Sequence, residues 1–100
     1  MSILVIGGDK LGNITHKLSE NGFSDIQHIS GRKYGDRKVK IHCKTDLVLV
    51  LIDFVDHALM NIIKKESKKY GIKITFSKRS WIHMENNIKN SIKEISNVLE

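Results

Sequence analysis

The feature that most constrains the fold of this chain is a run of six aliphatic residues, Leu47–Ile52, which ends at Asp53. The run is far shorter than the roughly 20 residues that a membrane-spanning helix needs. An unbroken apolar run of this length is typical of a strand that is buried on both faces of a sheet. Ser2–Ile6 has the same character and stops at Gly7-Gly8. The two runs therefore predict the centre of a parallel sheet that helices cover on both sides.

The segments around these runs carry further helix and strand patterns. Leu11, Ile14 and Leu18 recur at helical spacing, with Asp9 placed to cap the amino end of the helix and Asn21-Gly22 to end it. The other predicted elements are a strand over 23–29, a helix from residue 55 or 56 to 70, a strand over 72–76 and a last helix from about residue 80. Strands that alternate with helices indicate a three-layer architecture.

The predicted fold is therefore a single α/β domain over residues 1–100, Rossmann-like, with a four-stranded and mainly parallel sheet. Right-handed crossovers favour the strand order 2-1-3-4. Residues 30–45 leave two interpretations open. Val39, Ile41 and Cys43 alternate with polar neighbours, which fits a short extended piece, but an irregular helical crossover fits equally well.

Charge and cysteine content narrow the classes of partner and the compartment. The formal net charge is +6 and the sequence pI is about 9.6, so the surface attracts anions, either nucleic acid or a phosphorylated or carboxylated small molecule. Cys43 is the only cysteine, which excludes an internal disulfide and suits a reducing cytoplasm. Met1–Gly8 lacks the basic leader and cleavage site of a signal peptide. We therefore expect a cytoplasmic protein without a membrane segment.

In an open parallel sheet, ligands bind at the carboxyl ends of the strands, at the point where the strand order reverses. The loops that follow the predicted strands should meet there. We expect glycine N–H groups and arginines to hold an anion, while aspartates, histidine and hydroxyls orient it or hold a metal. The candidate ligand-binding residues are Gly7, Gly8, Asp9, Arg32, Asp53, Asp56, His57, Ser77, Arg79 and Ser80.

Familiar phosphate-binding motifs fit this edge poorly. Gly7 and Gly12 match the outer glycines of a dinucleotide fingerprint, but Asp9 takes the middle position, where its carboxylate would repel a pyrophosphate. The P-loop pattern is absent. Asp9, Asp53 and Ser77 stand at positions comparable to those of a phospho-accepting receiver domain, yet only one acid follows the first strand and a fifth strand with its lysine is missing. We interpret this likeness as a coincidence of fold.

Two candidate residues have a plain structural interpretation beside the functional one. His57 falls in the first turn of a helix, where the macrodipole favours a neutral imidazole that could act as a base or as a metal or haem ligand. Spacing alone favours a histidine without a role. Arg32, beside Gly31, could present a planar fork to an anion or simply belong to a solvated basic loop.

The chain resembles a bacterial family, domain of unknown function 2325. The resemblance is carried by the Gly-Gly-acid end of the first strand, the block from Asp46 to His57, and Tyr70–Ile74 with residues 77–80. It implies a Rossmann-like fold and a shared crevice, without an established activity. Some members carry a dehydrogenase label that rests on fold. Glu66 stands where relatives often have a cysteine, so cysteine chemistry there is not carried over.

Three functions from different classes follow. The leading hypothesis is a small-ligand binding or sensing module that holds an anion or a metal at the carboxyl ends of the strands. A basic nucleic-acid-binding protein is the alternative, and a small enzyme that uses His57 with Asp53 or Asp56 is the third. The exposed sheet edges of a four-stranded unit predict a homodimer. The sequence specifies no cofactor.

Overall fold

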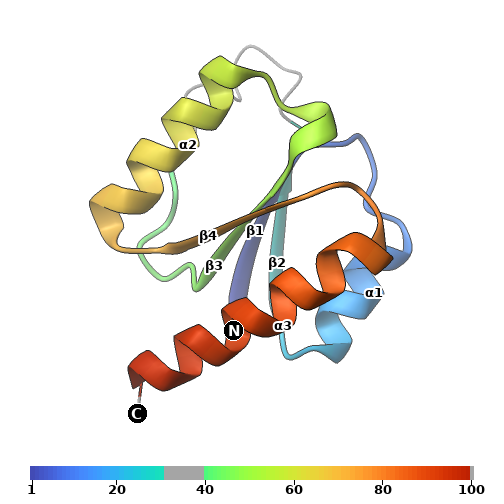
Figure 1. The fold of residues 1–100 in the computed structure, drawn as a ribbon, viewed down its shortest axis with the longest axis vertical. Coiled ribbons are helices and arrows are strands. Elements are labelled where there is room, and N and C mark those ends of the chain that lie inside the picture. The colour runs from blue at the N-terminus through green and yellow to red at the C-terminus, as the bar shows by residue number, and fades with distance from the viewer. Residues whose placement is uncertain (31–39, 100) are drawn as a thin grey trace.

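The computed structural model describes residues 1–30 and 40–99, with side chains as far as residue 96. One four-stranded sheet in the order β2-β1-β3-β4 forms its centre, and all of its pairings are parallel (Figure 1). The predicted α/β class, strand order and parallel sheet are confirmed. In chain order the elements are β1 Ser2–Ile6, α1 Asn13–Glu20, β2 Asp25–Ile29, β3 Leu47–Leu51, the 3-10 turn η2 Ile52–Phe54, α2 His57–Tyr70, β4 Lys73–Ser77 and α3 Trp81–Leu99.

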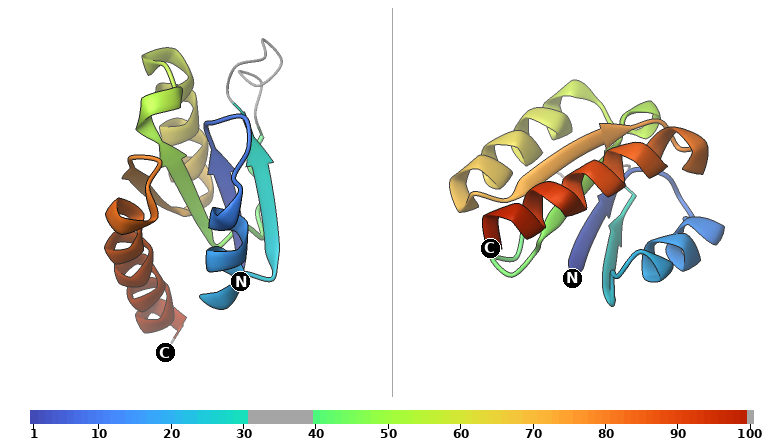
Figure 2. Two further views of the ribbon diagram at one scale, coloured as in Figure 1. Left: turned by 90° about the vertical axis from the view of Figure 1, so that its right-hand side faces the viewer. Right: turned by 60° about the horizontal axis from the view of Figure 1, so that its bottom comes forward.

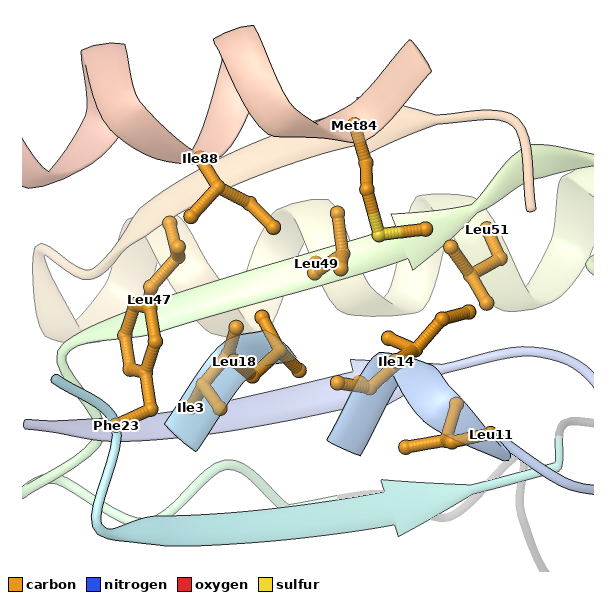
Figure 3. Packing of buried hydrophobic residues seen from close by; sticks show 11 residues of the cluster. Ile3, Leu11, Ile14, Leu18, Phe23, Leu47, Leu49, Leu51, Met84 and Ile88 are labelled. Carbon is orange, nitrogen blue, oxygen red and sulfur yellow. The ribbon is translucent and has the colours of Figure 1, made fainter. Parts of the chain in front are cut away.

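Helices cover both faces of the sheet, which produces two separate hydrophobic cores (Figure 2). On one face, Leu18 of α1 and Met84 and Ile88 of α3 pack on alternate residues of β1 and β3 (Figure 3). On the other face, Leu59 and Ile63 of α2 pack on the intervening residues. Because successive strand residues point to opposite faces, a strand that serves both cores must be apolar throughout, as β3 is.

The edges of several elements differ from the sequence predictions. Gly12 occupies the N-cap of α1, so the predicted capping role of Asp9 is wrong. Ile52 continues the apolar run but belongs to η2, because the chain turns off the sheet after Leu51. The sequence left two interpretations open for residues 30–45. The structure describes this segment at residue 30 and from residue 40 onward, and residues 40–46 contain neither strand nor helix. Ile41 is buried in the core on the α2 face, whereas Val39 lies outside the described residues.

No helix among the described residues has both the length and the apolar character needed to cross a membrane.

Candidate functional site

The loops that follow β1, β3 and β4 meet at the carboxyl ends of the strands. Together they line a shallow, open hollow of about 390 Å³, whose lining residues are Gly8, Asp9, Lys10, Phe54 and Arg79. We call this feature the rim hollow. Residues from three separate loops line it because parallel strands all point their carboxyl ends toward the same edge of the sheet.

The floor of the rim hollow is a glycine turn. Gly7 has φ +116° and its N–H donates to the Ile29 carbonyl at 2.8 Å. A Cβ at Gly7 would lie 2.9 Å from the Leu51 carbonyl oxygen, so only glycine lets β1 turn this closely against the end of β3. His28 of β2 lies with its Nε2 atom 3.0 Å from the Gly7 carbonyl oxygen. The turn is therefore fixed from both neighbouring strands.

Arg79 closes one side of the rim hollow. Its Nη2 group donates to the Lys10 carbonyl, and this bond joins the loop after β4 to the loop after β1 across the end of β3. The Arg79 stem passes over Gly8, where an added Cβ would lie 3.5 Å from Nε. A guanidinium has five N–H donors, so one bond to a carbonyl leaves capacity for an anion.

Phe54 forms the apolar wall of the rim hollow. It ends η2 and is 39% exposed, although the next residue, Val55, packs against the core on the α2 face. Its Cδ2 atom lies 3.9 Å from the Cβ position of Gly8, on which Arg79 also converges. The site thus combines an accessible aromatic ring with an anchored guanidinium.

Of the sequence-predicted site residues, the structure brings Gly8, Asp9 and Arg79 together in the rim hollow. Several others have structural contacts. Gly7 packs closely against Leu51. The Asp56 carboxylate accepts the Leu59 N–H at 2.8 Å as the N-cap of α2. The buried Ser77 donates its hydroxyl to the Lys78 carbonyl at 3.0 Å, and the Ser80 carbonyl accepts the His83 and Met84 N–H groups in the first turn of α3.

Two further predicted site residues, Asp53 and His57, do not line the rim hollow. Both are exposed. Arg32 lies outside the described residues. One oxygen of the Asp56 carboxylate caps α2, the helix that His57 begins. This carboxylate is therefore hydrogen-bonded to the helix backbone.

Lys10 and Phe54 were not among the site residues predicted from the sequence. A signal for each was available. Lys10 comes two residues after the Gly-Gly turn that ends the first strand, so it must stand at the edge of the sheet. Phe54 is an aromatic residue between two aspartates, in a loop that has no core position for it. An aromatic residue in a polar loop at a sheet's carboxyl edge is a candidate for ligand contact.

A second hollow, of about 410 Å³, lies at the opposite end of the sheet, where its lining includes Met1, Asp25, His42 and Asp46. Its carboxylates bind the start of β1. Asp46 accepts the Ser2 N–H at 2.8 Å, and the Ser2 hydroxyl donates to Asp25 at 3.3 Å. These bonds give the polar groups of this hollow a structural role.

Neither hollow assembles a metal centre within the described part of the chain, where no group of three or more His, Cys, Asp and Glu side chains has a suitable arrangement. The lysines of α2 form a separate basic face. Lys64 lies over the Phe76 ring at 5.3 Å and Lys69 over the Tyr70 ring at 5.4 Å, so these two cations already contact aromatic faces.

Comparison with known proteins assigns the chain to a family. Residues 2–91 match the family model described as "Uncharacterized protein conserved in bacteria (DUF2325)". The chain belongs to that family. The matched residues include the whole lining of the rim hollow, so in this DUF2325 chain the hollow lies within the region that the family model covers. Neither the curated proteins nor the solved structures contain a significant match.

Proposed function

We propose that this DUF2325 chain is a small-ligand binding module that holds an anion in the rim hollow. The observation that carries the proposal is the bond that holds the Arg79 guanidinium at the Lys10 carbonyl, with both residues in the lining of the rim hollow beside Gly8. Arg79 reaches this position from the far side of β3 and is held there by a backbone carbonyl. Because the side chain is already ordered, binding a ligand costs less conformational entropy.

The ligand is small. A hollow of about 390 Å³ is near the lower end of the roughly 300–1,000 Å³ found for small-molecule sites. Arg79 and Lys10 supply two cations and Asp9 one carboxylate, so the lining favours a single anionic group over a pyrophosphate. A charged acceptor binds a guanidinium more strongly than the neutral Lys10 carbonyl does.

Titration with inorganic phosphate and with ribose-5-phosphate, followed by nitrogen-edited NMR, tests the proposal. We expect the largest shifts at Gly8 and Lys10. Because a hydrogen bond to a charged group contributes about 1.5–3 kcal/mol, Arg79→Gln should weaken binding about tenfold or more. Lys65→Gln, which removes one positive charge from the exposed face of α2, is the matched control and should leave binding unchanged. Equal losses of affinity in both variants would show that overall charge, and not the rim hollow, accounts for the binding.

The enzyme alternative receives less support from the geometry. It requires His57 to act with Asp53 or Asp56, but these residues lie outside the lining of the rim hollow, and the Asp56 carboxylate caps α2. His57→Ala should therefore leave phosphate binding at the rim hollow intact. A loss of binding with an unchanged melting temperature would return His57 to the site.

We also propose that two copies pair through β2. The other edge of the sheet, β4, is covered by α3, because Asn87 donates to the Phe76 carbonyl at 3.0 Å and Lys73 pairs with Glu94. Such contacts blunt an edge strand against pairing. Sedimentation equilibrium should show a dimer, and the β2 amides should exchange more slowly as the protein concentration rises. A monomer at every concentration would contradict this pairing.

A further inference from the structure

The rim hollow contains features that a simple anion does not need. Phosphate would use Arg79 and Lys10, yet the same hollow also presents an aromatic ring and a carboxylate. Phe54 stands 39% exposed at the end of η2, although its neighbour Val55 packs against the core. A partly exposed aromatic side chain beside a cation, within a hollow, is suited to a ligand with a flat ring.

From this combination we propose that the ligand is a nucleoside monophosphate. The inference rests on the proposed function and specifies its ligand class. The base stacks on Phe54, the phosphate binds Arg79 and Lys10, and the sugar hydroxyls donate to the Asp9 carboxylate. Each wall of the rim hollow is thereby matched to one part of the ligand.

The geometry around Gly8 supports this division. Phe54 Cδ2 and Arg79 Nε lie 3.9 Å and 3.5 Å from the same point, the Cβ position that Gly8 lacks. The ring and the arginine stem therefore lie close to each other over Gly8, so one ligand can contact both. Base–aromatic stacking tolerates any base because every base has a π-face. We therefore expect weak discrimination between purines and pyrimidines.

The charge of the lining sets the number of phosphates. The two basic residues of the lining, Lys10 and Arg79, can neutralise one phosphate, whereas a second phosphate would lie near the Asp9 carboxylate. Asp9 also explains why the glycine turn departs from a dinucleotide fingerprint. Its carboxylate repels a second phosphate at the turn, but it is a strong acceptor for hydroxyl donors.

Calorimetric titration with AMP, UMP and ribose-5-phosphate tests the inference. Because a stacked base strengthens binding substantially, AMP and UMP should each bind about tenfold or more tightly than ribose-5-phosphate. Phe54→Ala should weaken the binding of AMP and UMP far more than that of ribose-5-phosphate, and thereby remove most of this difference. Tyr70→Ala is the matched control, since Tyr70 is an exposed aromatic at the carboxyl end of α2, away from the rim hollow, and should preserve the difference.

The outcomes separate this inference from the proposed function. If ribose-5-phosphate binds as tightly as AMP and depends on Arg79, the anion site stands and the nucleotide assignment is wrong. If none of the three compounds perturbs the rim hollow, both fail. Binding of an eight-residue oligonucleotide far more tightly than AMP, with dependence on Phe54, would overturn the mononucleotide assignment in favour of a nucleic-acid strand.

Discussion

Ser67 and Ser91 are both buried within helices, but their hydroxyl groups differ in hydrogen bonding. The Ser91 hydroxyl donates to the Asn87 carbonyl at 2.7 Å, whereas the buried Ser67 hydroxyl has no partner among the described residues. A buried hydroxyl without a bond costs about 1–3 kcal/mol. We therefore expect Ser67→Ala to raise the free energy of unfolding by about 1 kcal/mol. Urea denaturation measures the change, and Ser91→Ala, which loses a bond, should not share the gain.

The conformation of a single residue, Gly7, determines whether the rim hollow can form. An alanine there would combine φ +116° with a Cβ 2.9 Å from the Leu51 carbonyl oxygen and 3.0 Å from Leu51 Cβ. Strain and overpacking together should destabilise Gly7→Ala by about 3 kcal/mol or more. Gly71→Ala is the control, because Gly71 has φ +65° with nothing within 4 Å of its Cβ position. That variant should lose only about 1 kcal/mol. Equal losses would show that backbone conformation, and not the close approach, governs Gly7.

Among the elements, the N-terminus of α2 depends on one side chain. Asp56 accepts the Leu59 N–H at 2.8 Å, and α2 supplies the helical half of one core. Asp56→Ala should lower the free energy of unfolding by about 1 kcal/mol, and Asp56→Asn should recover most of the loss. Asp53→Ala, at an exposed position in the same loop, should stay within about 0.5 kcal/mol of the parent. If Asp56→Ala abolished phosphate binding and left the melting temperature unchanged, Asp56 would belong to the site instead.

The elements that could be predicted from the sequence are those whose burial leaves a pattern in the chain. β1 and β3 face a core on each side, so Ile3–Ile6 and Leu47–Leu51 are apolar without interruption. β2 lies at an edge and is only partly buried, and its start was correspondingly misplaced by two residues, at Phe23 instead of Asp25. The amino end of α1 was assigned to Asp9 because capping chemistry favours aspartate, whereas Gly12 holds that position.

The rim hollow was only partly predictable, because it depends on how far side chains reach. Topology alone brings the loops after β1, β3 and β4 to one edge, and it placed Gly8, Asp9 and Arg79 correctly at that edge. The bond from Arg79 to Lys10 joins residues 69 positions apart and crosses the end of β3. No local sequence pattern predicts a side-chain contact over that separation. The exposure of Phe54 likewise depends on the turn η2. The sequence did not predict this turn, because its first residue, Ile52, continues the apolar run of β3.

For the molecule as a whole, the net charge of +6 attracts any anion, so affinity for anions does not by itself identify a site. Two kinds of binding can be separated by where the charge lies. The lysines of α2 form a broad exposed face, whereas the rim hollow concentrates Lys10 and Arg79 beside a glycine turn. Attraction by the whole molecule should depend on the total charge, and specific binding on the rim hollow alone.

The double variant Lys65→Gln/Lys68→Gln tests this separation, since it lowers the formal net charge by two, from +6 to +4, without altering the rim hollow. Affinity for a single-stranded oligonucleotide should fall several-fold at low salt, because each lost phosphate contact removes about 0.7 from the slope of log affinity against log salt concentration. Affinity for AMP should stay within about twofold, because screened charges more than about 10 Å away contribute little at moderate salt. If AMP affinity fell in parallel with oligonucleotide affinity, the rim hollow would be no more than one part of a general basic surface. Unchanged oligonucleotide affinity would instead mean that α2 does not contact nucleic acid.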